Sequence, residues 1–252
     1  MGKMKLIGVY TKDFSLSHDI ISRLKQRGIE FIHLHSPDRI PSRVGVVITS
    51  SLEGREIKGK RTVFADCCRD IDSALDRAMD MLYGDENEIV LGVDPGEYPG
   101  IALLSGKSIL RTWCASSVEE ALKIIKNVLD DFPNRKRIVR IGHDAKVYRD
   151  RLVEGLKGKN VEIEIVNEER TSQKGGLSRK ERNELAAIKI ARSKGESLIR
   201  KGNRGFTNGE IKEVQRKSRI VSGGKITISR ELAIMVLEGK ISIEEAVKLS
   251  RH

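Results

Sequence analysis

The order of segments in the middle of the chain constrains its fold more than any other feature. Three strand-like apolar runs follow one another, separated by glycine-containing turns, at Ile89–Asp94, Gly100–Leu104 and Ser108–Cys114. Strands joined by short turns pair antiparallel, whereas strands joined through a helix pair parallel. Because helix-like and strand-like segments alternate after Cys114, the pattern predicts a mixed sheet in which parallel strands extend an antiparallel meander.

The segments after the meander carry the signals of helices and strands. Ser117 precedes a stretch of helical periodicity with glutamates in its first turn, and Ser178 precedes another, as is typical of helix starts. The closing helix that Ser178 begins is expected to bury Leu185, Ile188 and Ala191. The intervening segments are a strand at Arg137–Gly142, a helix at Ala145–Leu156 and a strand at Val161–Val166.

Residues 1–86 have a strand–helix–strand order of their own, which predicts a small open α/β domain with a parallel sheet. The turn after the first strand, Thr11–Ser15, has none of the glycines of a dinucleotide-binding loop, so that class of site is excluded. Asp13 and Asp66 follow strands and are interpreted as turn residues. The expected strands are Met4–Tyr10, Ile29–Leu34, Val44–Ile48 and Arg61–Ala65, and the expected helices start at Ser17 and at Asp70.

A chain of 252 residues exceeds one typical domain, and we expect three parts. They are the α/β domain at 1–86, the mixed-sheet domain at 87–198, and a basic linker with a helical hairpin at 199–252. No run of about 18 apolar residues exists, so neither a membrane-spanning helix nor a membrane partner is expected. The three cysteines lack zinc and disulfide spacing, which indicates a reducing, cytoplasmic setting. Three glutamines beside abundant Lys, Arg and Glu resemble thermophile usage.

The formal net charge of +11 is unevenly distributed. Residues 1–88 hold 14 basic and 14 acidic side chains and residues 89–166 hold 13 and 11, whereas residues 167–252 hold 20 and 11. A basic region of this kind is the electrostatic footprint of a polyanion-binding surface. The alternative is a solvated, lysine-rich surface, but the concentration of the excess in one third of the chain favours nucleic acid.

Acidic residues occur at three places that the expected fold brings together. They are Asp94 at the end of the first central strand, Glu168 and Glu169 after the last strand, and Glu181 and Glu184 on one face of the closing helix. Neighbouring carboxylates repel one another unless a cation neutralises them, and Mg²⁺ binds through carboxylates and substrate phosphate. Two such ions activate a water and stabilise the leaving oxygen of a phosphodiester. The alternative is that Asp94 caps a tight turn and the glutamates are surface charges.

Three motifs in this order resemble a known superfamily. Gly92–Gly96 (GVDPG) resembles the first-strand signature of the RuvC and YqgF branch of the RNase H-like superfamily, and Glu168–Ser172 (EERTS) resembles the motif after the fifth strand of YqgF-like proteins. Arg182–Ala187 (RNELAA) resembles the closing helix, whose small residues pack against the sheet. The resemblance covers roughly residues 88–195. It implies an RNase H-like sheet and metal-dependent cleavage, of a Holliday junction in RuvC and of ribosomal RNA precursor in YqgF.

The resemblance implies catalytic roles for Asp94, Glu169 and Glu184, and ligation of Mg²⁺, or of Mn²⁺ in its place, by Asp94, Glu169 and Asn183. The chain departs from the family at the third acid, which falls on Asn183; Glu184 is adjacent but rotated by about 100° around the helix. The strand at Arg137–Gly142 also lacks the glutamate of RuvC-type resolvases. Two hypotheses stand: a Mg²⁺-dependent nuclease acting on structured DNA or RNA, and a nucleic-acid-binding protein that has lost cleavage. An ATP-binding actin-like domain is disfavoured because no second Asp-x-Gly motif follows.

Basic residues around and after the closing helix are the expected contacts to nucleic acid. Phe206 is the one aromatic residue near these charges, so duplex or structured nucleic acid fits better than a stacked single strand. Short helices are expected at Asn208–Lys217, from Thr227 to Gly239, and after a cap at Ser242. The last two resemble an αα-hairpin or part of a helix-turn-helix. The alternative is a hairpin that packs on the mixed-sheet domain or on a partner in a homodimer. The expected contact residues are Arg170, Lys174, Arg179, Lys180, Arg200, Lys201, Arg204, Arg216, Lys217 and Arg219.

Overall fold

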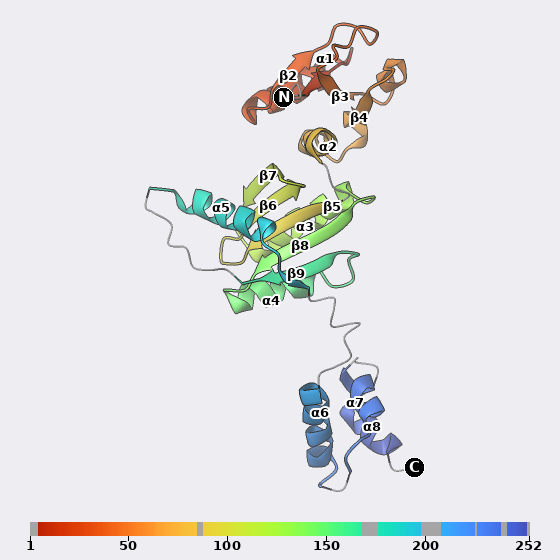
Figure 1. Cartoon of the computed structure of the whole chain (residues 1–252), viewed down its shortest axis with the longest axis vertical. Coiled ribbons are helices and arrows are strands. Elements are labelled where there is room, and N and C mark those ends of the chain that lie inside the picture. Colours follow the sequence, from red (N-terminus) through yellow and green to blue (C-terminus); the bar gives the residue numbers. More distant parts are fainter. Residues whose placement is uncertain are drawn as a thin grey trace. The chain divides into compact units, whose positions relative to one another are not determined.

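The computed structural model of the chain describes residues 5–84, 88–167, 176–197, 208–224, 226–237 and 241–250 (Figure 1). The chain divides into two compact units, Met1–Glu196 and Ser197–His252. The first unit is a mixed α/β structure that contains a parallel and a mixed sheet, and three helices make up most of the second. In the described part of the chain, no helix is long and apolar enough to cross a membrane.

The first sheet is entirely parallel, as the strand–helix–strand order predicts. Its strands are β1 (Leu6–Val9), β2 (Phe31–His33), β3 (Val44–Thr49) and β4 (Arg61–Phe64). They lie in the order β2-β1-β3-β4, so the direction of progression reverses between β1 and β3. One 3₁₀ turn, η1 (Glu53–Glu56), follows β3, and another, η2 (Ala65–Cys67), follows β4.

Both helices of this part pack on the same face of the first sheet. α1 (Phe14–Gln26) and α2 (Ile71–Tyr83) share one apolar core with alternate residues of the strands. Loop residues cover the other face, among them Ile40 and Ile57. The sheet therefore has a helical layer on one side and loops on the other.

The start of α1 corrects one expectation. The helix begins at Phe14 and not after Ser17, because the Asp13 carboxylate caps it by accepting a hydrogen bond from the Leu16 backbone N–H at 3.0 Å. Ser17 lies buried inside the helix. The rule that predicts a cap at Ser17 applies equally to Asp13, which stands four residues closer to the strand. α2 starts where it is predicted, and the Asp70 side chain accepts a backbone hydrogen bond from its first turn.

The second sheet has the mixed pairing that the order of the central segments predicts. Its strands are β5 (Glu88–Asp94), β6 (Gly100–Ser105), β7 (Ser108–Cys114), β8 (Lys136–Gly142), β9 (Glu162–Val166) and the two-residue β10 (Glu196–Ser197). β5, β6 and β7 form an antiparallel meander, and β8 and β9 extend the sheet in parallel with β5. The strand order is β10-β9-β8-β5-β6-β7, so β5 lies in the interior.

Helices cover both faces of the second sheet. The crossovers through α3 (Val118–Asp131) and α4 (Lys146–Gly155) run in the same direction, so right-handed connections place both helices on one face. α5 (Arg179–Arg192) lies on the other face, where Ala187 and Ala191 pack on residues of β5, β6 and β8 (Figure 1). The predicted caps are present: Ser117 accepts a backbone hydrogen bond from the first turn of α3, and Ser178 forms a capping box on α5.

The buried face of α5 differs in part from the expected one. Ala191 is buried and Ile188 partly buried, as expected, but Leu185 is 39% exposed. Ala187 and Ile190 are buried instead. At about 100° per residue, Leu185 is rotated by roughly 200° from Ala187 and so faces away from the sheet.

α2 joins the two sheets of the first unit through a row of aspartates. Asp72, Asp76 and Asp80 recur every fourth residue and therefore share one face of the helix. Their side chains are 11%, 5% and 6% exposed, respectively. The partners are Arg23, Arg27 (3.3 Å) and Arg111 (3.0 Å) for Asp72, Arg27 (2.7 Å) and Arg111 (3.5 Å) for Asp76, and Arg135 (2.7 Å) and the Ser105 hydroxyl (2.6 Å) for Asp80.

One of these arginines also protects the outer strand of the second sheet. The Arg27 guanidinium donates a hydrogen bond to the Leu110 backbone oxygen of β7 at 2.7 Å. The peptide groups on the outer side of such a strand otherwise face solvent and are free to pair with another chain. The helices of the first sheet therefore cover part of the outer edge of the second.

The second unit is a bundle of three helices. α6 (Asn208–Val221), α7 (Arg230–Leu237) and α8 (Ile243–Leu249) surround a core of their own. α6 is longer than the predicted Asn208–Lys217, because Ser218 is fully buried in the bundle and the helix continues past it. The cap that Ser242 is predicted to form on α8 is present. The core consists of Ile211, Val214, Ile228, Ala233, Ala246 and Val247.

Candidate functional site

Asp94 is the last residue of β5, at the carboxyl end of an interior strand of the second sheet. It is half-buried and lies opposite Gly100 of β6 in the pairing register. On the other side of β5, the preceding residue Val93 pairs with Ile141 of β8. Asp94 therefore lies at the carboxyl end of an interior strand, with β6 on one side and β8 on the other, as the segment order predicts.

α5 approaches this part of the sheet so closely that two glycines are required. A Cβ atom at Gly92 would collide with the backbone oxygen of Ala187, and one at Gly100 would collide with the backbone oxygen of Asn183. Backbone atoms of the helix cannot move aside without displacing the whole helix, so a larger residue at either position is excluded. Since Gly100 pairs with Asp94, this contact brings Asn183 to the end of β5 that carries the carboxylate.

Asn183 and Glu184 are neighbours in sequence but contact different parts of the sheet. The Asn183 side-chain amide donates a hydrogen bond to the Tyr98 backbone oxygen, in the loop after Asp94, at 2.7 Å. The Glu184 carboxylate instead accepts a hydrogen bond from the Thr112 hydroxyl of the outer strand β7 at 2.9 Å. It is 20% exposed. Of the two candidates for the third ligand, Asn183 is therefore the one tied to the loop that follows Asp94.

The first turn of α5 is also tied to the loop after Asp94. The Arg179 guanidinium lies 4.1 Å from the centre of the Tyr98 ring, within the range of a cation–π contact, and 3.4 Å from the Glu97 carboxylate. Hydrogen bonds from the Ser178 hydroxyl and backbone N–H lower the pKa of the Glu181 carboxyl, so Glu181 is occupied as part of the cap. This arrangement holds a basic helix start beside the end of β5.

Several predicted site residues lie outside the described residues. They are Glu169, Arg170, Lys174, Arg200, Lys201 and Arg204. Within the described ranges, no group of three His, Cys, Asp or Glu residues is arranged to hold a metal ion. Of the predicted metal ligands, the structure describes Asp94 at the end of β5 and Asn183, which contacts the loop after it.

The remaining predicted basic contacts lie on two helices. Lys180 is on α5 and is 73% exposed. On α6, Arg216 is 62% exposed and forms two hydrogen bonds, of 2.8 and 2.9 Å, with the Glu213 carboxylate. Lys217 and Arg219 are exposed on the same helix, and Arg219 donates a hydrogen bond to the Thr227 hydroxyl. These cations are accessible to a polyanion.

At the carboxyl end of the first sheet, acidic side chains from the segments that follow β3 and β4 pair with neighbouring protein groups. Open α/β sheets bind ligands where the strand order reverses, here between β1 and β3. Glu53 of η1 accepts hydrogen bonds there from the Lys12 backbone N–H and from the Ser50 hydroxyl, the latter at 2.8 Å. Glu56 pairs with the Lys12 amine at 3.2 Å. Asp66 accepts a backbone hydrogen bond from Ser51 at 2.8 Å, which agrees with its interpretation as a turn residue.

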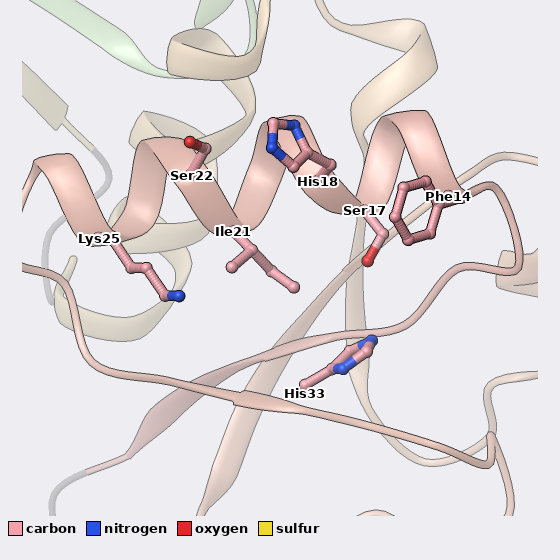
Figure 2. Close-up of a pocket in the computed structure, with 7 residues that line it drawn as sticks. All are labelled: Phe14, Ser17, His18, Ile21, Ser22, Lys25 and His33. Carbon is pink, nitrogen blue, oxygen red and sulfur yellow. The ribbon is translucent and has the colours of Figure 1, made fainter.

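A shallow hollow of about 290 Å³ lies between α1 and β2 on the first sheet. Figure 2 shows Phe14, Ile21 and Lys25 of α1 on the side of the helix that faces His33. Phe14 is 85% exposed. The surface of the hollow is mostly apolar, and it includes none of the predicted site residues.

Sequence reasoning missed a cluster of charges between α1, α2 and β7. Arg111 and Trp113 of β7 were not singled out, although Trp113 is the single tryptophan of the chain. The signal available in the sequence was the alternation Arg111-Thr112-Trp113 in a strand, which places Arg111 and Trp113 on the same face.

Two family models match the chain. Residues 6–82 match a family described as a response regulator receiver-like domain, and residues 207–252 match one described as a three helical bundle domain. Each covers less than half of the chain, and residues 83–206, with Asp94 and Asn183, lie between the two matches. No curated protein is significantly similar to the chain.

Two solved structures of Marinitoga piezophila Argonaute are similar to the chain at 9% identity and a TM-score of 0.25. The complex with 5′ OH guide RNA covers 66% of this chain and 40% of the Argonaute chain. The complex with 5′ OH guide RNA and target DNA covers 98% and 55%. The chain thus spans about half of the Argonaute length or less. A TM-score this low does not indicate a shared fold.

Proposed function

We propose that the chain is a metal-dependent nuclease of the RNase H-like type that cuts structured DNA or RNA. The observation that carries the proposal is that α5 crosses the second sheet in direct backbone contact at Gly100, which brings Asn183 to the end of β5 where Asp94 lies. The strand order supports the RuvC and YqgF resemblance. In this order the strand that carries Asp94 is interior. The other two strands of the antiparallel meander lie on one side of it, the parallel strands β8 and β9 lie on the other, and α5 packs across the sheet.

The donors at the end of β5 fit a hard divalent cation. A carboxylate and a side-chain amide oxygen are oxygen ligands, and Mg²⁺ commonly binds proteins through one or two carboxylates together with substrate phosphates. When bound, such an ion would activate a water and stabilise the leaving oxygen of a phosphodiester. In the proposal, Asp94 binds the ion together with Glu169. The hydrogen bond to Tyr98 orients Asn183, so that its side-chain oxygen points away from the Tyr98 carbonyl.

Basic side chains supply the contacts to nucleic acid in this proposal. Arg179 is held beside the loop after Asp94, and Arg216, Lys217 and Arg219 are exposed on α6. Such cations bind phosphates and position a nucleic acid without reading its sequence.

A gel assay tests the proposal. The substrates are a branched DNA junction, a hairpin RNA and single strands of each, with and without Mg²⁺. We expect Mg²⁺-dependent cleavage of the junction or the hairpin. We expect Asp94→Asn to lower the rate by about 100-fold or more, since each factor of ten corresponds to about 1.4 kcal/mol of lost transition-state stabilisation.

The matched control is Asp130→Asn, which removes a carboxylate that is 63% exposed on α3. It should cleave as the wild type does. Equal activity of Asp94→Asn and wild type would overturn the proposed site. Loss of cleavage in both variants would show that the assay reports on something other than Asp94.

The second candidate function is nucleic-acid binding without cleavage, and Asn183 at the third ligand position favours it. An amide is a weaker ligand than a carboxylate because it carries no charge to offset that of the cation. Binding of the junction or hairpin with no cleavage in Mg²⁺ or Mn²⁺ would establish this candidate. In that case Asn183→Asp should increase the affinity for Mn²⁺, and calorimetric titration with the metal alone measures it.

A further inference from the structure

A polar recess of about 480 Å³ lies between α1, β7 and the start of α5. Four of its ten lining residues come from the helices of the first sheet, namely α1 with its C-cap Arg27, and α2. Glu184 is the residue that the recess shares with the predicted catalytic set. The lining residues are Arg23, Gln26, Arg27, Asp72, Leu110, Arg111, Thr112, Trp113, Lys180 and Glu184.

The cations of the recess outnumber its carboxylates. Three guanidinium groups and one amine line it, against the carboxylates of Asp72 and Glu184 in the lining and of Asp76 next to them. The Lys180 amine lies 4.0 Å from the nearest oxygen of Glu184, and its side chain is 73% exposed. An anionic group that enters the recess therefore meets an accessible cation and an excess of positive charge.

A flat stacked pair forms one wall of the recess. The Arg111 guanidinium lies 4.7 Å from the centre of the Trp113 ring. Asp72 holds the guanidinium in this position by accepting its hydrogen bond at 3.0 Å. Asp76 lies 3.5 Å from the same group and is almost fully buried, so the support is rigid. Aromatic rings and guanidinium planes are the surfaces on which unpaired bases stack.

We propose that the recess binds an unpaired nucleotide of the nucleic acid. Its base stacks on the pair of Trp113 and Arg111, and its phosphate contacts Lys180. This inference rests on the nucleic-acid binding of the proposed function and is independent of cleavage. The helices that pack on the first sheet then contribute to recognition. Asp72 and Asp76 of α2 hold Arg111 in place, and α1 supplies Arg23 and Gln26 to the wall.

Fluorescence of the single tryptophan tests the inference directly, because excitation beyond the absorption band of the four tyrosines restricts the emission to Trp113. The probes are a blunt DNA duplex and the same duplex with a short single-stranded overhang, both in EDTA to prevent cleavage. We expect the overhang duplex to quench Trp113 and to bind more tightly than the blunt one. Lys180→Ala should reduce that preference about tenfold, the equivalent of one charge-assisted hydrogen bond of about 1.4 kcal/mol.

Two further variants keep the outcome interpretable. Lys180→Arg keeps the charge and should restore the preference. Lys189→Ala removes an exposed cation from the solvent side of the same helix and should leave the preference unchanged. Equal affinity for both duplexes, with no effect of Lys180→Ala, would overturn the inference and leave nucleic-acid binding intact. Failure to bind either duplex would overturn the inference together with the binding part of the proposed function.

Discussion

The charges of α2 and those of α6 lie in opposite surroundings. The α2 aspartates are 5 to 11% exposed and bind arginines from other elements, whereas Arg216 of α6 is 62% exposed and pairs with Glu213 of its own helix. A buried charge that loses its partner has no water to replace it, while water replaces the partner of an exposed charge at little cost. The comparison teaches that charges hold the first unit together but remain available to ligands in the second.

The largest expected effect comes from Asp76→Ala. The substitution leaves Arg27, which is 13% exposed, and Arg111 without this carboxylate between the two sheets. Breaking a buried ion pair by removing one partner costs about 3–5 kcal/mol. Because Asp72 still pairs with both guanidinium groups, we expect the free energy of unfolding to fall by about 3 kcal/mol, the lower end of that range. Urea denaturation followed by circular dichroism measures it.

The control for that measurement is Asp130→Ala on α3, where the side chain is 63% exposed. Its effect should stay within about 0.5 kcal/mol, as is usual for surface positions. If both substitutions had the same small effect, the contrast between buried and exposed charges would be wrong for this molecule.

The next effect in size concerns binding. Replacing Arg216, Lys217 and Arg219 with alanine should leave the unfolding transition of the protein unchanged, because all three side chains are exposed. The affinity for a duplex should fall at low salt, and the slope of log affinity against log salt should become shallower by about 3, at roughly 0.9 per lost phosphate contact. Fluorescence anisotropy across a salt series measures the slope. An unchanged slope would remove α6 from the binding surface.

A smaller effect is the acid sensitivity of the first unit. Burial raises the pKa of Asp72, but the hydrogen bond from Arg23 and the charges of Arg111 and Arg27 outweigh it, so the pKa lies below its ordinary value. Such a group contributes stability that is complete above its unfolded pKa of about 3.9 and is lost as the pH falls through the folded pKa. We expect the Tm to begin to fall below about pH 4.

Asp72→Asn tests the assignment of that acid sensitivity. The variant should have a lower Tm at neutral pH and a shallower fall in acid, because it lacks the carboxylate that titrates. Thermal scans at a series of pH values compare it with the wild type. Parallel curves for the two proteins would assign the acid sensitivity to other carboxylates.

The smallest expected effect is that of Glu213→Gln. The hydrogen bond from Arg216 lowers the pKa of Glu213, but both groups are exposed to water. We therefore expect no measurable change in the unfolding transition and at most about a twofold gain in duplex affinity, because Arg216 is released. A loss of stability comparable with that of Asp76→Ala would contradict the expectation that exposed charges on α6 contribute little to stability.

Local signals in the sequence predicted local structure well. Ser117, Ser178 and Ser242 cap helices as expected, because a cap depends on residues within one turn. The position of Asp94 in the interior of a sheet followed from the order of the strands. The start of α1 was missed because two residues near it, Asp13 and Ser17, satisfy the same rule.

Long-range contacts could not be predicted from the sequence. Asp72 lies in the first turn of α2, where a carboxylate is explained by the helix alone, and nothing in the pattern connects it with Arg111, 39 residues away. The choice between Asn183 and Glu184 likewise depends on where Thr112 of β7 and the Tyr98 carbonyl lie. Those positions follow from how α5 packs on the sheet, which periodicity does not determine.

The contact of α5 with Gly92 and Gly100 has a consequence for tracing the ancestry of the chain. Neither position has space for a methyl group, whatever chemistry the protein performs. A lineage can exchange an acid for an amide at position 183 and still fold, but it cannot enlarge either glycine without separating the helix from the sheet. We therefore expect the two glycines to persist in divergent descendants longer than the acids, and to be the better markers of common origin.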